Sequence, residues 1–242
     1  MQQGILAPVP AVSRYLFLSL PVDAEWEPLR DTLESIVDGN SIVAGFGKSL
    51  VDLAAGRIRA LREAPVYAHG GIAIAAQPWA LLLWLRGDDQ GDLVNLTLQI
   101  QSALDGLAEI GEIIDGFRYR DSRDLSGYID GTENPDGEDA LAAAFDEAGN
   151  SFLAVQRWEH DLTWFHALDE AQQDEVFGRH KATNEEFDAP DSAHVKRAAQ
   201  EDFSPEAFML RRSMPWADPS GEGLVFVSFG NSFYAFDAVM RR

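Results

Sequence analysis

The sequence has 242 residues, of which 46% are apolar and 24% are charged, a composition typical of globular proteins rather than of disordered or fibrous chains. Nineteen Lys and Arg against forty Asp and Glu give a formal net charge of −21, which repels phosphate backbones and anionic lipids. We therefore expect neither nucleic acid nor a membrane as a partner. The chain has no Cys, which excludes disulfides, iron–sulfur clusters and thiolate-ligated metals.

The start of the chain, Met1–Arg14, lacks a basic flank followed by an apolar segment. The apolar run Trp79–Leu85 is too short to span a bilayer. These two features predict a soluble, cytoplasmic protein.

The first half of the chain predicts strands and helices in the order β-α-β-β-α-β, which is the ferredoxin-like pattern. Short apolar runs favour strands, and apolar residues at three- and four-residue steps favour helices. Gly39 stands where the first helix would end, and is expected to cap it. The expected strands are Tyr15–Leu20, Ser41–Phe46, Ala80–Leu85 and Glu112–Tyr119, and the expected helices cover 26–36 and 93–107.

The second half predicts the same series without its last strand. The expected strands are Phe152–Trp158, Phe208–Arg212 and Leu224–Phe229, and the expected helices are Asp161–Phe177 and Ser232–Met240. The fold class is therefore α+β, with two ferredoxin-like domains of antiparallel strands, at residues 1–125 and 126–242. Two polar stretches, 121–150 and 178–206, are long for loops, and functional residues are expected there.

Several familiar motifs fail on inspection. Gly47-Lys48-Ser49 is not a phosphate-binding loop, because the first glycine of that motif would fall on Ile42. The acidic stretch from Asp130 to Gly137 does not match the ligand spacing of a calcium loop. No GxSxG motif and no HExxH pair is present, so a serine hydrolase and a zinc hydrolase have little support.

The motif GYIDGTENP at Gly127–Pro135 resembles the GxxDGT motif of the dye-decolourising peroxidases. Six further matches follow the order of that family and cover most of the chain, and the resemblance is closest to its compact intracellular bacterial branch. They are QxGIL near the start, WLRGDDQGDL at Trp84–Leu93, VQRWEHDL at Val155–Leu162, GRHK at Gly178–Lys181, AHVKR at Ala193–Arg197 and LRRSMPW at Leu210–Trp216. The resemblance implies a dimeric α+β barrel-type superfold.

The resemblance also implies an activity and a cofactor. It implies one haem b per chain, with His194 as the proximal iron ligand, Asp130 as the distal acid–base residue, Arg211 as the distal cation and Ser213 as a small polar distal residue. Such an enzyme reduces hydrogen peroxide through a ferryl intermediate and oxidises dyes, phenols and other small organic reductants. A carboxylate base predicts an acidic pH optimum, and the Arg211 charge is expected to keep Asp130 ionised.

A larger set of residues is expected to contact the haem or its propionates. The set is Ile129, Gly131, Thr132, Glu133, Arg179, Val195, Leu224 and Phe226. Taken singly, these residues have simpler explanations: the DGTENP segment is good turn chemistry, charged loop residues are usually solvated, and Leu224 and Phe226 belong to a core strand.

The family resemblance leaves two alternatives open. One is a haem-handling protein, similar to deferrochelatases, whose peroxidase activity is incidental. The other is an acidic interaction domain without a cofactor. By resemblance we expect a homo-oligomer. Some relatives enter protein shells through a C-terminal tag, and no such tag is visible here.

Overall fold

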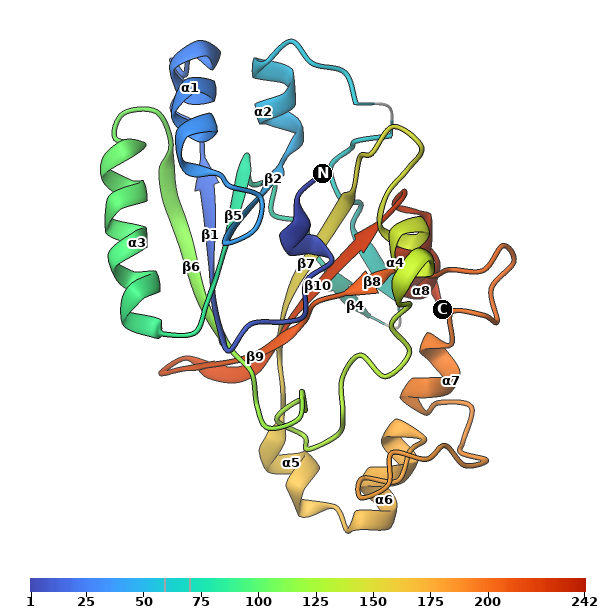
Figure 1. Ribbon diagram of the computed structural model, residues 1–242. Coiled ribbons are helices and arrows are strands. Elements are labelled where there is room, and N and C mark those ends of the chain that lie inside the picture. The colour runs from blue at the N-terminus through green and yellow to red at the C-terminus, as the bar shows by residue number, and fades with distance from the viewer. Residues whose placement is uncertain (59, 70) are drawn as a thin grey trace. The chain divides into compact units, whose positions relative to one another are not determined.

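The structure is a computed structural model that describes residues 1–58, 60–69 and 71–242 (Figure 1). The chain divides into two compact units, Met1–Phe117 and Arg118–Arg242. Both units combine an antiparallel sheet with helices, so the fold is α+β and consists of two ferredoxin-like domains, as expected. The sequence placed the domain limit at 125/126, and that limit stays a prediction.

The first unit contains a four-stranded antiparallel sheet in the order β2-β5-β1-β6. A ferredoxin-like repeat places its second, third, first and fourth strands in this order. The elements are the short 3₁₀ turn η1 (Gln3–Ile5), β1 (Val12–Ser19), α1 (Trp26–Ile36), β2 (Ile42–Phe46), α2 (Lys48–Leu53), β3 (Tyr67–His69), β4 (Ile72–Ile74), β5 (Leu81–Gly87), α3 (Gln90–Ala103) and β6 (Glu109–Phe117).

The core of the first unit lies between this sheet and its helices. In Figure 1, α1 and α3 run along the same face of the sheet. Leu16 and Leu18 of β1 pack in one cluster with Leu29 and Leu33 of α1 and Ile100 of α3, all at most 4% exposed. Full burial of each such side chain contributes about 1.5–3 kcal/mol.

The opposite face of β1 is buried as well. Tyr15 stacks on Trp84 with ring centroids 6.1 Å apart, and Trp84 Nε1–H donates to Ser13 Oγ at 2.9 Å. A strand buried on both faces needs no polar alternation, which explains the continuous apolar run in its sequence.

The expected strands and helices of the first unit are all present, with ends that differ by a few residues. The helix α2 and the β3–β4 hairpin were not predicted. The prediction that Gly39 caps the first helix is wrong. That helix ends at Ile36, with Val37 already extended, and Gly39 has φ +71° in the turn into β2, where its N–H donates to Ile42 O.

The second unit has a sheet in the order β9-β10-β7, with β8 also paired to β10. These are the second, third and first strands of the repeat, and no strand follows α8 in the part of the chain that the structure describes, as expected. The elements are α4 (Gly137–Ala144), β7 (Phe152–Glu159), α5 (Leu162–Ala167), α6 (Glu170–Phe177), α7 (His194–Ala198), β8 (Leu210–Arg211), β9 (Met214–Asp218), β10 (Gly221–Gly230) and α8 (Tyr234–Arg241).

The two faces of β10 differ in burial. Val225 and Val227 are at most 1% exposed, whereas Leu224 and Phe226, which alternate with them, are half-buried. Ser228 shares the face of Leu224 and Phe226, and it pairs with Arg211 of β8. The less buried face of this sheet therefore carries Arg211.

Two element predictions for the second unit need correction. The single helix expected over Asp161–Phe177 is two helices, because Asp169 caps α6 in a box with Gln172, and Leu168 before it is extended. The strand expected at Phe208–Arg212 is reduced to Leu210–Arg211, and β9, α4 and α7 were not predicted.

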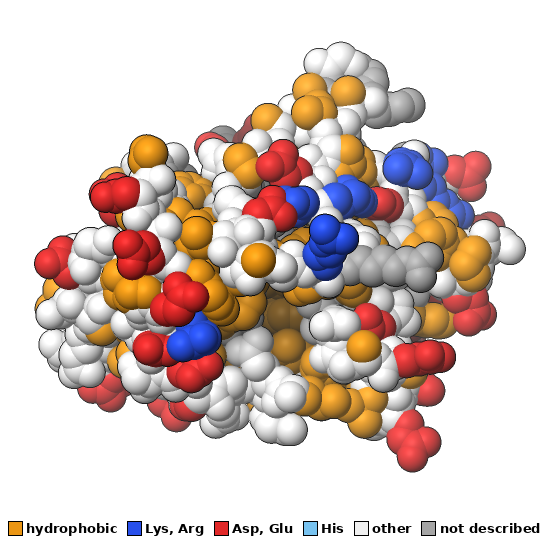
Figure 2. Space-filling view, turned by 90° about the horizontal axis from the view of Figure 1, so that it is seen from above, with side chains coloured by type: hydrophobic (Ala, Val, Ile, Leu, Met, Phe, Trp, Pro, Cys, Tyr) orange, Lys and Arg blue, Asp and Glu red, His pale blue; other side chains and the backbone are white. Residues whose placement is uncertain are grey.

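The surface is rich in acidic side chains, as the net charge requires. Figure 2 shows Asp and Glu spread over the face that it presents, with hydrophobic side chains between them. None of the helices that the structure describes is long and apolar enough to cross a bilayer.

Candidate active site

The segment from Tyr119 to Pro135 forms a folded loop that carries Asp130. Arg123 forms isolated β-bridges with Tyr119 and with Ile129, and the Asp130 N–H donates to Ser122 O at 2.9 Å. Ile129, expected near the cofactor, thus belongs to a bridge of this loop. These backbone bonds fix the position of Asp130 within the second unit.

Asn134 joins this loop to strand β8. Its Nδ2 donates to Arg211 O at 3.0 Å, and its Oδ1 accepts from the Arg211 N–H at 2.8 Å. Gly131, with φ +77°, makes the turn between Asp130 and Asn134, and a Cβ there would lie 2.8 Å from Asn134 Nδ2. The loop of Asp130 and the strand of Arg211 are therefore held together by one amide side chain, a role that was not predicted for Asn134.

Asp130 is half-buried, and its pKa is raised. Burial is the largest cause, and the charge of Asp124 acts in the same direction. Arg211 opposes the rise, as do a backbone hydrogen bond from Gly131 and the His194 ring. The expectation that Arg211 favours the ionised carboxylate has the right sign, but burial outweighs it, so Asp130 holds its proton more tightly than an ordinary Asp.

His194 is the first residue of α7 and lies within electrostatic reach of Asp130 and Arg211. Burial lowers its pKa most, followed by Arg211, and Arg179 adds to the shift, while Asp130 and Asp124 oppose it. The residue is nevertheless accessible to solvent, and neither ring nitrogen has a hydrogen-bond partner among the described residues. A neutral imidazole with an available lone pair is the form that binds a metal.

The end of α6 approaches the start of α7 very closely. Gly178 ends α6 with φ +81°, and a Cβ on it would lie 2.4 Å from Val195 Cγ2. Phe177 lies beside His194, with ring centroids 6.1 Å apart. Val195, expected to contact the cofactor, packs on Gly178 and so fixes the helix that begins with His194.

Arg211 provides the cation of this site. Its backbone is held by β10 and Asn134, and its Nε is buried without a hydrogen-bond partner among the described residues. A buried guanidinium nitrogen without a partner is costly, and such groups are found where a ligand or reacting group is bound. Ser213, two residues further, is 9% exposed, and its Oγ accepts a long 3.3 Å bond from Val227 N.

Glu133 and Arg179, which were expected to contact the haem or its propionates, form an ion pair. Arg179 Nη2 lies 2.6 Å from Glu133 Oε1 and also contacts Glu186. Thr132 joins the same network through a hydrogen bond from Asn184 Nδ2 at 3.1 Å. The network ties the loop after Asp130 to the segment after α6.

Leu224 and Phe226 lie on β10, on the face shared with Arg211. Phe226 packs against the cluster of Met209 and Ala235, with its ring 6.3 Å from that of Phe236. This contact with the core cluster agrees with the expectation that Phe226 belongs to a core strand, and Leu224 is half-buried on the same face.

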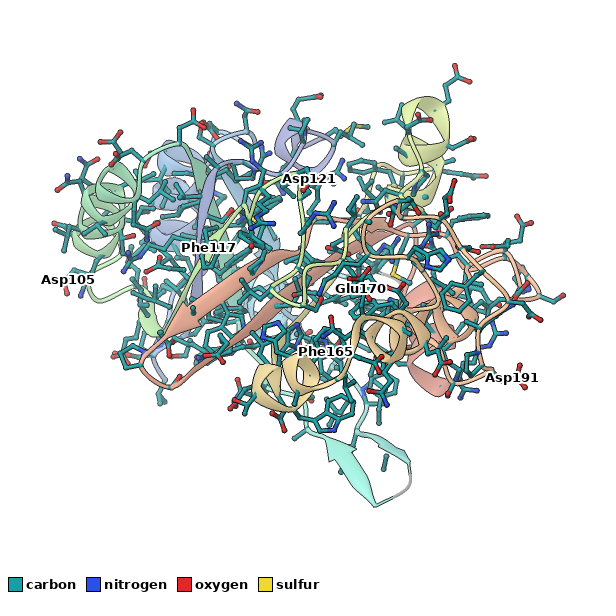
Figure 3. All side chains as sticks on the ribbon, turned by 90° about the horizontal axis from the view of Figure 1, so that it is seen from below. Asp105, Phe117, Asp121, Phe165, Glu170 and Asp191 are labelled. Atoms are coloured by element: carbon teal, nitrogen blue, oxygen red, sulfur yellow. The ribbon has the colours of Figure 1, made fainter. Side chains whose placement is uncertain are left out.

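An aromatic cluster anchors the same loop to α5 and α6. Tyr128 stacks on Phe177 with ring centroids 4.0 Å apart, and it meets the edge of Phe165. Its hydroxyl donates to Asp174 Oδ1 at 2.5 Å. Figure 3 shows Phe165 on α5, close to Glu170 at the start of α6. This contact of Tyr128 was not predicted, although Tyr128 directly precedes the IDGT residues.

The structure thus brings Asp130, Arg211 and His194 within electrostatic range of one another, although Asp130 and Arg211 are 81 positions apart in the sequence. No cluster of three or more His, Cys, Asp or Glu side chains able to hold a bare metal ion occurs among the described residues. The chemistry available is that of one imidazole donor, one carboxyl group of raised pKa and one fixed cation.

Residues 121–242, half of the chain, match the family model described as Dyp-type peroxidase, C-terminal. The dye-decolorizing peroxidase of Brevibacterium linens is 28% identical, over 94% of this chain and 69% of its own length. That of Mycolicibacterium paratuberculosis is 30% identical over 69% of this chain, and this chain spans only half of it.

Two solved structures are similar over nearly the whole chain. A putative Dyp-type peroxidase from Shewanella oneidensis has a TM-score of 0.89 and 27% identity, covering 98% of this chain and 85% of its own. A variant of DypB from Rhodococcus jostii RHA1 in complex with heme has a TM-score of 0.88 and 27% identity, covering 99% and 86%. On the family match and these relatives, the chain belongs to the Dyp-type peroxidase family.

Proposed function

We propose that this protein is a haem-dependent peroxidase in which His194 ligates the iron and Asp130 and Arg211 act on the bound peroxide. The observation that carries the proposal is the pairing of an imidazole of lowered pKa with a half-buried carboxyl group and a guanidinium whose Nε is buried, where neither the imidazole nor that Nε has a hydrogen-bond partner among the described residues. A related protein in complex with heme supports the choice of cofactor.

The residues present fit a haem group in their chemistry. A proximal His is the standard peroxidase ligand, and the lowered pKa of His194 keeps its ring neutral and able to bind. Arg211 Nε offers a buried donor that nothing in the described chain accepts. The haem we propose is haem b, one per chain, and when bound it supplies the redox chemistry that breaks the peroxide O–O bond.

Asp130 would move the proton in this reaction. As a carboxylate it takes a proton from the hydroperoxide oxygen that binds, and returns it to the outer oxygen, which leaves as water. Its raised pKa brings its proton affinity closer to that needed for both halves of the transfer. Arg211 stabilises the negative charge that develops as the outer oxygen departs.

The remaining predicted residues would serve this centre by position. Ser213 lies two residues after Arg211, and the Glu133–Arg179 pair holds the segment that follows Asp130. We propose hydrogen peroxide, dyes, phenols and similar small organic molecules as substrates. The cytoplasmic location and the homo-oligomer expected from the sequence stay predictions.

The test is reconstitution of the chain with haemin, followed by absorbance. We expect one equivalent to give a sharp Soret band in the wild type and in the control His166→Ala, which removes an exposed histidine, and a lost or displaced band in His194→Ala. An identical spectrum and affinity in His194→Ala would refute the ligand assignment.

The second step of the test adds hydrogen peroxide and a dye. Asp130→Asn is expected to bind haem normally but to bleach dye about 10²–10⁴ times more slowly. Release of iron with the porphyrin intact, without multiple turnovers of dye, would instead support the haem-handling alternative.

A further inference from the structure

A histidine–carboxylate contact lies in the loop that carries Asp130. His160 Nε2 lies 3.0 Å from Asp124 Oδ1, and Asp124 is only 7% exposed. The other carboxylate oxygen of Asp124 accepts from the Ser126 N–H at 2.8 Å. Both oxygens of this buried carboxylate are thus engaged, one by the loop itself and one by His160.

Asp124 closes a tight turn in that loop. Its N–H donates to Tyr128 O at 2.9 Å, and its carbonyl accepts from the Gly127 N–H at 2.8 Å. Just outside this turn, the Asp130 N–H donates to Ser122 O. The backbone at Asp130 therefore follows directly from the conformation of the turn that Asp124 holds.

His160 connects this turn to the sheet. It follows β7 directly, and its N–H donates to Glu222 O of β10 at 2.9 Å. The residue is therefore anchored to the strand pair through its backbone and to Asp124 through its ring. Among the described residues of this loop, Asp124 alone forms an ion pair with a residue at the end of β7.

We propose that His160 is a positioning residue for Asp130: its contact with Asp124 fixes the turn at residues 124–128 against the end of β7 and so sets the place of the Asp130 carboxyl group. This inference rests on the peroxidase function proposed above, for which Asp130 is the proton carrier. His160 itself touches neither substrate nor cofactor in this scheme.

The electrostatics of the pair agree with this role. The hydrogen bond to Asp124 raises the pKa of His160, although burial opposes it. Burial alone would raise the pKa of Asp124, but the hydrogen bonds from His160 and Ser126 lower it overall. Both shifts favour the charged forms, so the contact is an ion pair while His160 is protonated and Asp124 ionised, and a weaker neutral hydrogen bond once His160 loses its proton.

The charged groups around His160 do not offer a competing partner. Glu159 and Asp161 flank it in the chain, and Glu222 lies across the strand pair. None of these three carboxylates forms a hydrogen bond or ion pair with the His160 ring among the described residues. On the loop side Arg123, next to Asp124, is engaged by Asp121.

The decisive experiment uses the full chain without cofactor and follows backbone amide signals by NMR as the pH is raised. In the wild type, the Gly127 and Asp130 amide shifts should titrate together with the His160 ring, at a midpoint above 6.5. His160→Gln should abolish this titration and increase amide exchange at Asp130 about tenfold or more. The matched control His166→Gln makes the same chemical change at an exposed site and should leave both unchanged.

Asp124→Asn provides an independent arm if His160→Gln folds poorly. In that variant the His160 midpoint should fall to 6.5 or below, because the carboxylate that raises it is gone. The proposal would be overturned if the Asp130 amide shift does not change as His160 titrates in the wild type. It would also be overturned if the Asp130 amide exchanges in His160→Gln at the wild-type rate.

Haem-loaded protein then separates this inference from the function on which it rests. His160→Gln should retain one haem per chain. Its kcat for peroxide turnover should fall by a larger factor than its KM rises, and the acid limb of its pH–rate profile should be displaced. A chain that binds no haem would contradict the proposed function, yet leave the cofactor-free titration as a valid test of the loop.

Discussion

The close approach of α6 and α7 at Gly178 yields a sharp stability prediction. Gly178→Ala places a non-glycine residue at φ +81°, which costs about 1–2 kcal/mol. It also puts a Cβ 2.4 Å from Val195 Cγ2 and 3.3 Å from two alanine Cβ atoms, and overpacking of this kind costs about 1–3 kcal/mol more. We therefore expect a total loss of about 2–5 kcal/mol in the free energy of unfolding, measured by urea denaturation of the cofactor-free chain.

Gly149→Ala is the matched control for this experiment. Gly149 also has φ +81°, but no described atom lies within 4 Å of a Cβ built on it, so only the backbone cost should appear. The difference between the two variants measures the contact that holds the start of α7, where His194 begins the helix. Equal losses in the two variants would refute the claim that the close approach matters.

Three further predictions follow from the site. Asp130→Asn should raise the free energy of unfolding of the cofactor-free chain at neutral pH, measured by urea denaturation. The folded-state pKa of Asp130 is raised, so in the wild type this carboxyl group's contribution to stability is lost as the pH rises through that pKa. The advantage of the variant should therefore vanish below pH 3.8. Asn134→Ala removes both side-chain bonds to the Arg211 backbone and should cost about 1–3 kcal/mol by the same assay, with slower dye bleaching. Haem affinity, titrated at several pH values, should fall as His194 gains its proton, with a midpoint below 6.5 because its pKa is lowered.

The sequence predicted the fold well where burial is periodic or continuous. The strands β1, β5 and β10 contain continuous apolar runs that favour a strand, and α1 has apolar residues at helical spacing. The helix α2 has only six residues, and the strands of the β3–β4 hairpin have three each, too short for a pattern to show. The break between α5 and α6 depends on a local cap that competes with helical periodicity.

The site was predictable in its chemical groups but not in its supports. Asp130, His194 and Arg211 stand in motifs that a family resemblance identifies. The Asn134 amide joins the Asp130 loop to a strand 77 residues away, and nothing in the local pattern indicates that partner. The His160–Asp124 contact joins residues 36 positions apart, and no local sequence pattern predicts it either.

The energetics of the second unit point to the same location as the chemistry. Burial raises the pKa of Asp130 and lowers that of His194, and Arg211 Nε is buried without a hydrogen-bond partner in the part of the chain that the structure describes. Each feature is unfavourable for the isolated chain, and each is maintained by contacts whose own contribution is favourable: the Asn134 clamp, the Gly178 approach and the Asp124–His160 pair. Unfavourable groups persist in a fold only when their surroundings over-determine them, and they concentrate where a ligand or a reaction stabilises them. A purely structural loop would have no reason to collect all three, so the supports and the strained groups together favour a site that binds and turns over a substrate.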